Sequence, residues 1–222
     1  MPAKTAILIG ATGLVGHHCL QQLLDSPAYG KVVAVSRRPI PLQHEKLVRI
    51  EVASFDHLGE ALQGVKAYDA FCCIGTTIRQ AGTKAEFHKV DYGYALEFAH
   101  RMLRNGAKHF LLVSALGAQA NSPVFYSRVK GLLEQEIRGL GFPRLSVFRP
   151  SLLVGGRPEN RLGEALGLRL TNLVAPLLRG PLASMHPIQG ADVAAAMVAC
   201  AQEKSAEPVK IYRYEEMQAL LA

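Results

Sequence analysis

The chain of 222 residues has no tryptophan, four cysteines and no block of five residues with the same charge. The cysteines show neither a Cys-x-x-Cys motif nor a paired spacing, and no histidine stands near one at a metal-ligand spacing. These absences argue against a disulfide framework and against a metal site. Free thiols indicate a reducing compartment, and we expect the cytoplasm.

Long apolar runs are missing as well. The longest late run, residues 193–201, is about half as long as a membrane span requires. Residues 5–15 follow a lysine and are mostly apolar, but glycines interrupt them and no small-x-small cleavage pattern follows. We therefore expect a protein that is neither secreted nor membrane-spanning.

Positive charge exceeds negative charge. The formal charge is +7, part of it at Arg37 and Arg38 and part within residues 157–179. Such a balance fits an anionic partner, which could be a nucleic acid, an acidic membrane surface or a phosphate-bearing small molecule. Aromatic residues do not alternate with the arginines, which argues against nucleic acid. A bound phosphate cofactor explains the charge at least as well.

The composition is that of a folded α/β domain, with 49% hydrophobic and 19% charged residues. Short apolar runs typical of buried parallel strands alternate with segments of helical periodicity. The expected strands are residues 5–9, 31–35, 47–52, 69–74, 108–113 and 145–148, and the expected helices are residues 14–24, 55–62, 83–103 and 123–138. This alternation predicts a doubly wound parallel sheet, the Rossmann fold, in a single domain over residues 1–222.

The regular alternation of expected strands and helices ends after residue 150, so we expect residues 1–150 to form the dinucleotide-binding core. Residues 151–222 are expected to form a small substrate-side extension instead of an independent domain. Its expected elements are helices at 162–178, 191–200 and 215–221 and a strand at 209–212.

A glycine loop joins the first expected strand to the first helix. Gly10 permits a sharp turn, Gly13 lets the backbone approach a pyrophosphate, and Gly16 lets the helix pack close to the sheet. The start of the helix offers unpaired N–H groups and partial positive charge to phosphates. The alternative is a glycine turn without a ligand. The predicted cofactor contacts in this loop are Gly10, Thr12, Gly13, Leu14, Val15 and Gly16.

The end of the second strand indicates which dinucleotide is bound. NAD-binding proteins usually place an acidic residue there for the ribose 2′-hydroxyl, but this chain has Ser36-Arg37-Arg38. Two guanidinium groups could hold a 2′-phosphate, which favours NADP(H) over NAD(H), although two solvated arginines remain an alternative. Gly75-Thr76-Thr77, after the fourth strand, is expected to pass under a cofactor ribose.

Tyr126 and Lys130 are four residues apart on an expected helix and therefore share one face. A free tyrosine is a poor acid or base at neutral pH, but a nearby ammonium and an oxidised nicotinamide would both favour its phenolate. Tyr126 could then exchange a proton with the substrate while hydride moves. Ser114, at the end of the fifth strand, would hydrogen-bond the same substrate oxygen, and Lys130 would also reach the cofactor ribose. The alternative is a surface pair.

At this point the chain resembles the short-chain dehydrogenase/reductase superfamily, in particular the atypical Tat-interacting-protein-like oxidoreductases. The resemblance rests on Phe-Cys-Cys-Ile-Gly-Thr-Thr at residues 71–77 and Ser-Val-Phe-Arg-Pro at residues 146–150. It implies an NADP-binding fold with Ser114, Tyr126 and Lys130 as the catalytic triad. It also implies that Arg149-Pro150-Ser151 leads into the substrate cleft, with Pro150 beside the cofactor.

One position departs from the superfamily pattern. Many members have an asparagine that supports a water relay to the lysine, and the nearest residue here is Asp91. An ionised aspartate accepts hydrogen bonds but cannot donate them. Asp91 is therefore either a changed relay residue or a carboxylate on the helix surface.

The main hypothesis is an NADP(H)-dependent oxidoreductase that acts on a small carbonyl or alcohol. The alternative is a regulatory protein that senses NADP(H) and binds a protein partner. No residue pattern identifies the substrate or the oligomeric state. The segments expected to border the substrate cleft contain Thr77, Arg79, Ser151, Arg157 and His186.

Overall fold

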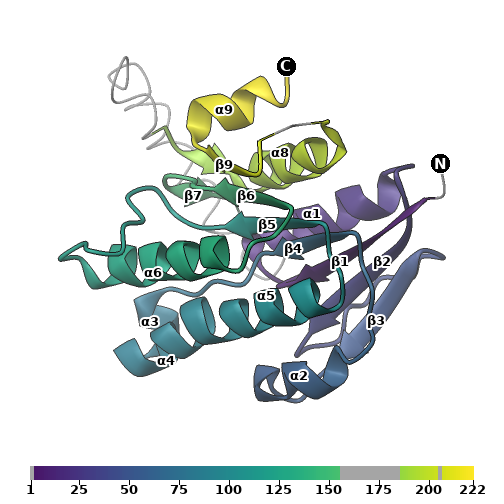
Figure 1. Ribbon diagram of the computed structural model, residues 1–222, viewed down its shortest axis with the longest axis horizontal. Coiled ribbons are helices and arrows are strands. Elements are labelled where there is room, and N and C mark those ends of the chain that lie inside the picture. Colours follow the sequence, from purple (N-terminus) through teal and green to yellow (C-terminus); the bar gives the residue numbers. More distant parts are fainter. Residues whose placement is uncertain (1–2, 156–185, 205–206) are drawn as a thin grey trace.

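The computed structural model describes residues 3–155, 186–204 and 207–222. Their main sheet has the strand order β3-β2-β1-β4-β5-β6-β9, and every neighbouring pair in it is parallel (Figure 1). This order confirms the predicted doubly wound sheet. The strands are β1 (Lys4–Ile9), β2 (Tyr29–Ser36), β3 (Leu47–Glu51), β4 (Asp69–Cys72), β5 (His109–Val113), β6 (Arg144–Phe148) and β9 (Val209–Tyr212).

Helices cover both faces of the sheet (Figure 1). One layer contains α1 (Leu14–Asp25) and α8 (Gly190–Gln202), and the other contains α2 (Leu58–Ala61), α5 (Ala95–Arg104) and α6 (Phe125–Gly139). Because successive strand residues point to opposite faces, Leu8 joins the core beneath α1 and α8, while Ile7 joins the core beneath α5 and α6. Double-sided burial explains why the strands are almost continuously apolar. Within the described ranges, no helix is long and apolar enough to span a membrane.

The C-terminal part of the chain contributes to the sheet itself. Strand β9 pairs with β6, and α8 packs against α1. A two-stranded sheet of β7 (Leu153–Val154) and β8 (Ile188–Gln189) precedes α8, and α9 (Tyr214–Ala219) follows β9. The helix expected at residues 162–178 lies outside the described residues.

The long helix expected at residues 83–103 is confirmed, and it contains a π-helical turn. The chain forms α3 (Ile78–Ala81), α4 (Lys84–His88), the π-helical turn η2 (Lys89–Tyr94) and then α5. Thr83 begins α4, since its hydroxyl oxygen accepts the N–H of Glu86 at 3.1 Å. A π turn has a wider hydrogen-bond spacing than an α-helix and often occurs at functional sites. In η2 it accompanies a fully buried carboxylate, Asp91.

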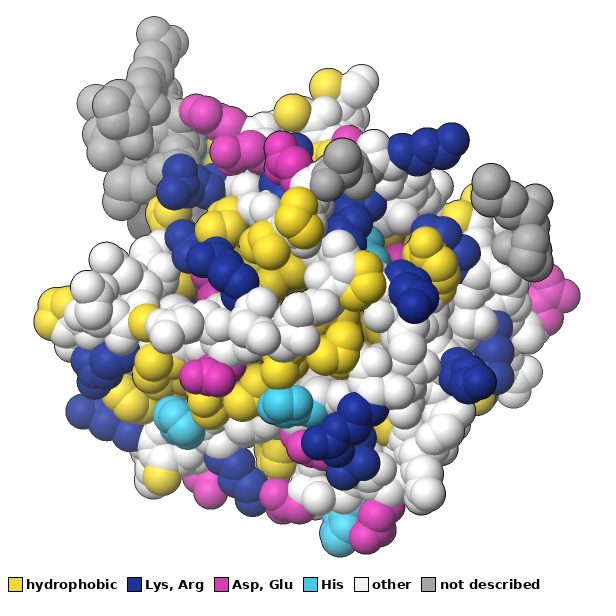
Figure 2. All heavy atoms as spheres, viewed as in Figure 1, with side chains coloured by type: hydrophobic (Ala, Val, Ile, Leu, Met, Phe, Trp, Pro, Cys, Tyr) yellow, Lys and Arg dark blue, Asp and Glu magenta, His cyan; other side chains and the backbone are white. Residues whose placement is uncertain are grey.

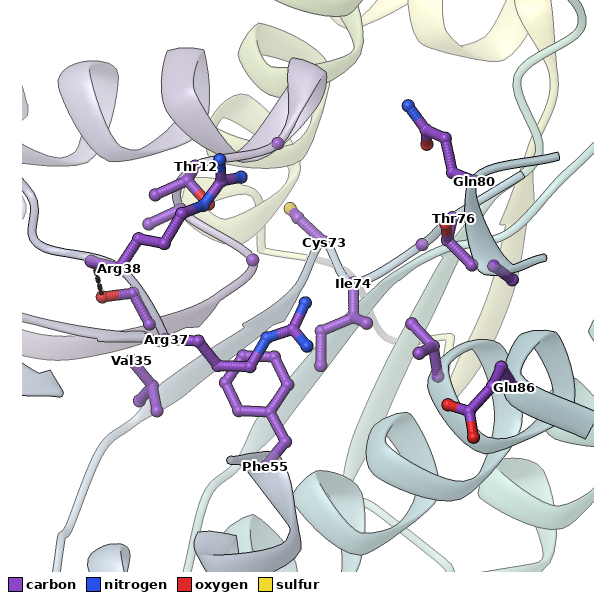
Figure 3. A pocket seen from close by; sticks show the side chains of 17 residues that line it. Thr12, Val35, Arg37, Arg38, Phe55, Cys73, Ile74, Thr76, Gln80 and Glu86 are labelled. Atoms are coloured by element: carbon purple, nitrogen blue, oxygen red, sulfur yellow. Dashed lines mark hydrogen bonds between the residues drawn. The ribbon is translucent and has the colours of Figure 1, made fainter. Parts of the chain in front are cut away.

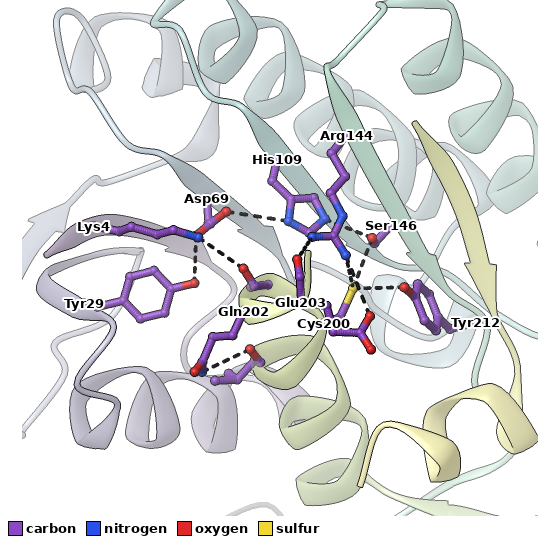
Figure 4. A network of polar contacts seen from close by, with 12 residues as sticks. Lys4, Tyr29, Asp69, His109, Arg144, Ser146, Cys200, Gln202, Glu203 and Tyr212 are labelled. Atoms are coloured by element: carbon purple, nitrogen blue, oxygen red, sulfur yellow. Dashed lines mark hydrogen bonds and ion pairs between the residues drawn. The ribbon is translucent and has the colours of Figure 1, made fainter. Parts of the chain in front are cut away.

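A polar network closes the amino-terminal edge of the sheet (Figure 4). The buried carboxylate of Asp69 accepts hydrogen bonds from the Tyr29 hydroxyl at 2.8 Å and from Lys4 Nζ at 3.2 Å. His109 Nδ1 lies 3.6 Å from the other Asp69 oxygen, and His109 Nε2 lies 2.9 Å from the Ser146 hydroxyl. These contacts join β1, β2, β4, β5 and β6 at the edge opposite to the glycine loop.

Candidate functional site

The glycine loop follows β1 at the carboxyl edge of the sheet, where the strand order reverses between β1 and β4. Gly10 has φ +89°, and a Cβ there would lie 2.6 Å from the backbone carbonyl carbon of Cys73. A Cβ at Gly16 would lie 2.0 Å from the carbonyl oxygen of Gly10. Both positions therefore require glycine, and together they bring α1 against the end of β1. This is the close approach that a dinucleotide cradle needs.

The first turn of α1 faces this cradle with backbone N–H groups that have no partner within the helix. Gly13 is the N-cap and offers no side chain, and this turn contains no acidic residue. The first hydrogen bond at the start of the helix is donated by the His17 N–H to the Gly13 carbonyl oxygen at 3.0 Å. Donors at the start of a 12-residue helix favour an anion such as a pyrophosphate.

A cavity of about 470 Å³ lies beside the loop (Figure 3). Of the predicted cofactor contacts, the cavity is lined by Gly10, Thr12, Gly13, Ser36, Arg37, Arg38, Gly75 and Thr76. The remaining predicted contacts lie outside its lining; these are Leu14, Val15, Gly16, Thr77, Lys130 and Pro150. Sequence reasoning did not identify several other lining residues, among them Phe55, Gln80 and Glu86. The residues present fit a dinucleotide, because a glycine cradle and two guanidinium groups share one cavity.

The two arginines have different surroundings in the cavity (Figure 3). The Arg37 guanidinium lies over the Phe55 ring, 5.0 Å from its centroid, whereas Arg38 extends towards Thr12. The Ser36 hydroxyl donates to the Arg38 carbonyl at 2.7 Å and so stabilises the turn that carries both arginines. Glu86 lies across the cavity from them, so positive charge is concentrated at the end of β2.

Tyr126 and Lys130 share one face of α6, as predicted. Tyr126 is half-buried, and its ring centroid lies 5.4 Å from that of Phe87. Lys130 is buried, and its Nζ lies 2.7 Å from Asp91 Oδ1. A Cβ at Gly75 would lie 3.7 Å from the same Nζ, so the lysine directly borders the turn that lines the cavity beside the glycine loop.

The electrostatics around Tyr126 differ from the sequence expectation. Burial raises the pKa of the Tyr126 phenol, the Lys130 ammonium lowers it and the Asp91 carboxylate raises it, so the pKa lies above its ordinary value. For Lys130, burial lowers the pKa. The charge of Asp91 and its contact with the ammonium raise the pKa, and together with smaller contributions they outweigh the effect of burial. The net pKa of Lys130 is above its ordinary value. Without a bound cofactor, the phenol and the ammonium are therefore the stable forms.

Ser114 is buried at the end of β5 and has an unexpected partner. Its hydroxyl donates to Glu134 Oε1 at 2.5 Å, and Glu134 forms an ion pair with Arg149 at 2.5 Å. Glu134 lies two helical turns beyond Tyr126 on α6, and this bond commits the Ser114 hydroxyl hydrogen to the carboxylate. Sequence reasoning missed Glu134. The available signal was a carboxylate four residues after Lys130 on the same helix face.

Glu134 and Arg149 also border a second cavity, of about 700 Å³. Its walls are the loop of residues 116–120, the C-terminal half of α6 and two further arginines, Arg138 and Arg213. In this region, between α6 and α9, Figure 2 shows Lys and Arg side chains (dark blue) beside hydrophobic ones (yellow). This cavity shares no lining residue with the cavity at the glycine loop.

The other predicted residues have structural contacts. The Thr77 hydroxyl caps α3 by accepting the Gln80 N–H at 3.1 Å, and the Pro150 carbonyl accepts the Leu116 N–H at 2.8 Å. The Ser151 hydroxyl donates to the His186 carbonyl, and the His186 ring stacks on Tyr214 at 5.3 Å. Arg79 is exposed on α3, and Arg157 lies outside the described residues. Asp91 is fully buried, so the alternative of a surface carboxylate is wrong.

Comparison with known proteins identifies relatives along most of the chain. The family model described as NAD(P)H-binding matches residues 10–138. Protein HTATIP2 of Rattus norvegicus is 38% identical over 169 residues, covering 75% of this chain and 69% of that protein. The mitochondrial protein FMP52-1 of Scheffersomyces stipitis is 38% identical over 224 residues, covering 97% and 98% of the two chains. These relatives confirm the resemblance to Tat-interacting-protein-like proteins.

Solved structures share the fold at low sequence identity. A short chain dehydrogenase from Burkholderia cenocepacia, in complex with NADP, has a TM-score of 0.67 at 14% identity, covering 99% of this chain and 92% of that one. The enzyme WbmH of Bordetella bronchiseptica, in complex with NAD+, has a TM-score of 0.69 at 13% identity, covering 95% and 75%. At these identities the likeness establishes the Rossmann fold and nothing about the choice of dinucleotide.

The relatives also correct one sequence prediction. Several FMP52 proteins are named as mitochondrial, which contradicts the cytoplasmic location expected for this chain. The expectation was wrong because free thiols indicate a reducing environment without telling one such compartment from another.

Proposed function

This chain belongs to the NAD(P)H-binding family, and we propose that it is an NADP(H)-dependent oxidoreductase of the short-chain dehydrogenase/reductase type. Its substrate is a small carbonyl or alcohol. The observation that carries this proposal is the placement of Tyr126 and Lys130 on one face of α6, with the Lys130 ammonium next to Gly75 of the cofactor cavity. A tyrosine with an adjacent buried cation at a dinucleotide site is a group that can exchange a proton during hydride transfer.

The preference for NADP(H) rests on Arg37 and Arg38. Both line the cavity at the end of β2, where an acidic residue would favour the unmodified ribose of NAD. A 2′-phosphate at this end of the cavity would receive charge-assisted hydrogen bonds from guanidinium groups. Arg37 is already oriented by its contact with Phe55, which lowers the entropy lost on binding.

The chain's own residues manage the proton. NADPH, when bound, supplies the hydride. Tyr126 donates its phenolic proton to the substrate oxygen in reduction and takes it back in oxidation. The Lys130 ammonium stabilises the phenolate that forms, and Ser114 completes the proposed catalytic set. Because its own hydrogen goes to Glu134, the Ser114 oxygen acts as an acceptor towards a substrate hydroxyl.

Cofactor binding is tested by titrating the purified protein with NADPH and with NADH and following nicotinamide fluorescence. We expect NADPH to bind at least about tenfold more tightly, which corresponds to about 1.4 kcal/mol. The double variant Arg37→Gln/Arg38→Gln should remove this difference while NADH affinity stays the same. Arg104→Gln, an exposed arginine on α5, is the matched control. Equal affinity of the wild type for both dinucleotides would contradict the NADP assignment.

The catalytic role is tested with Tyr126→Phe and a panel of small carbonyl compounds. The variant should lose turnover of any compound that the wild type reduces, while its NADPH affinity stays within about twofold. Normal turnover by Tyr126→Phe would show that the proton comes from another group.

One observation favours a second function, that of a regulatory protein whose partner binding depends on NADP(H). The Ser114 hydrogen is committed to Glu134, which leaves one member of the expected catalytic set without a free donor. In that case, binding of a protein partner should change when NADPH is added. Partner binding that is indifferent to NADPH would exclude this function.

A further inference from the structure

Asp91 is a buried charge with no assigned role. Its side chain is fully buried on the π-helical turn η2, which follows α4 and precedes α5. Desolvation makes a lone carboxylate at such a position costly, so buried carboxylates are paired. The two oxygens of Asp91 contact two different parts of the candidate site.

One oxygen contacts the lysine and the other contacts the cofactor turn. Oδ1 lies 2.7 Å from Lys130 Nζ, and Oδ2 accepts the backbone N–H of Thr76 at 2.8 Å. Thr76 lines the cavity beside the glycine loop, and Lys130 lies on α6. The carboxylate therefore links three elements: η2, the turn after β4, and the helix that carries Tyr126.

The charges around Lys130 leave Asp91 as its counter-ion. Among the described residues, the titratable groups that act on Lys130 are Asp91 from η2, Tyr126 from α6 itself and Cys72 from β4. The Lys130 side chain is 4% exposed, so water screens it little, and Tyr126 and Cys72 are neutral in their ordinary forms near pH 7. A neutral amide at position 91 would leave the buried ammonium without an opposite charge from the part of the chain that the structure describes.

We propose that Asp91 is a positioning residue that supplies the counter-charge of Lys130 and ties this lysine to the Thr76 backbone of the cofactor turn. The inference rests on the proposed oxidoreductase function and deepens it. In place of a neutral residue that passes protons on, this chain has a fixed ion pair that holds the lysine charged. The ammonium is then present to stabilise the Tyr126 phenolate before and after each proton transfer.

The experiment is an NMR titration of the full chain with ¹³C-labelled lysine, which needs neither cofactor nor substrate. The Lys130 signal is assigned by its absence in Lys130→Met. In the wild type, we expect Lys130 to remain an ammonium through pH 10. In Asp91→Asn, which keeps an oxygen for the Thr76 N–H, the midpoint should fall by at least about two pH units because burial is no longer compensated.

A matched control is available at the surface. Asp56 forms an exposed ion pair with Lys89 at 3.0 Å, so Asp56→Asn should leave the Lys130 midpoint unchanged. A Lys130 midpoint in Asp91→Asn within about half a unit of wild type would overturn the proposal. If Asp91→Asn does not fold, Asp91→Asn/Lys130→Met should recover folding, because it removes the unpaired charge. A double variant no more stable than Asp91→Asn would also overturn it.

The pH profile of turnover supplies a functional readout. In Asp91→Asn, the alkaline limb of kcat/KM should move to lower pH by the same interval as the Lys130 midpoint. If the Lys130 titration midpoint moves and the alkaline limb of kcat/KM does not, the charge of Lys130 does not serve catalysis. That result would overturn the proposal that Asp91 acts on turnover through Lys130. Failure of the oxidoreductase function itself would be seen separately, as absent turnover in the wild type with the NMR result intact.

Discussion

Substitution of Gly16 by alanine tests the closest backbone approach in the candidate site. The added Cβ would lie 2.0 Å from the Gly10 carbonyl oxygen and 2.7 Å from its carbon, where ordinary contact begins at 3.4 Å. The loop or α1 would therefore have to move by about 1.4 Å, the difference between 3.4 and 2.0 Å, and neither can yield by a side-chain rotation. Overpacking typically costs about 1–3 kcal/mol, and we expect about 3 kcal/mol here because both partners are backbone.

The same displacement should weaken cofactor binding. It separates the start of α1 from the end of β1, and so moves the first N–H groups of the helix away from the cradle that Gly10 forms. We expect Gly16→Ala to lower NADPH affinity by at least about tenfold, measured by nicotinamide fluorescence. Urea unfolding gives the loss of stability independently, so weak binding by a folded protein can be told from unfolding.

Gly139→Ala is the matched control. Gly139 is the last residue of α6, and a Cβ there would meet no atom within 4 Å. Alanine at this helical position should leave NADPH affinity unchanged and stabilise the protein by up to about 1 kcal/mol. Wild-type stability and NADPH affinity in Gly16→Ala would refute the reasoning about the cradle.

Three further predictions concern buried charge and pH. Asp69→Asn removes the carboxylate shared by Lys4, Tyr29 and His109, and should cost about 3 kcal/mol in urea unfolding, against at most about 0.5 kcal/mol for the exposed control Asp25→Asn. Burial lowers the pKa of His109, against an opposing contribution from Asp69, so the unfolded chain binds the additional proton. The contribution of His109 to the free energy of unfolding is therefore fully present above pH 6.5 and is lost as the pH falls below this value. Urea unfolding at successive pH values should show this decrease in the free energy of unfolding, and His109→Gln should make it smaller. Because burial raises the pKa of Tyr126, kcat/KM for reduction should show no Tyr126-dependent loss from neutral pH to about pH 10, whereas alcohol oxidation should still increase at pH 10.

The parts of the fold that the sequence predicted are those governed by local patterns. Strand β1, the glycine loop and α1 follow one another in the chain, so apolar run, turn and helical periodicity specify their geometry together. The alternation of strands and helices then indicates a parallel sheet with right-handed crossovers, but the order of the strands comes from the structure. The pair Tyr126 and Lys130 needed only helical spacing.

Contacts between distant segments were not predictable in this way. The stacking of Arg37 on Phe55 joins the end of β2 to the short helix η1 (Phe55–His57), and nothing in either local pattern indicates it. The bond between Ser114 and Glu134 likewise depends on how the end of β5 meets α6. Each contact is set by packing of the finished sheet, which periodicity does not describe.

Asp91 is an intermediate case, because its burial could have been inferred. In the expected helix it falls four residues after Phe87 and four before Ala95, both of which are buried. A carboxylate in an apolar stripe needs a cation, so this position already argued against the surface alternative. The wider spacing of the π turn was not visible, since an inserted turn leaves the residue types unchanged.

The ionic residues of α6 show why spacing alone does not identify partners. Lys130 and Glu134 are four residues apart with opposite charges, a spacing that predicts a pair within the helix. Both are buried, and each pairs with another element instead: Lys130 with Asp91 of η2, and Glu134 with Arg149 after β6. A pair within the helix would satisfy both charges equally well but would fix α6 to nothing. Two pairs to different elements fix the rotation of α6 and its position along its own axis, relative to the carboxyl edge of the sheet. Any shift of the helix would separate a pair and leave a buried charge without its partner. The same two pairs hold the helix that carries Tyr126 next to the cavity beside the glycine loop, so the placement of the tyrosine depends on ion pairs that Tyr126 itself does not form.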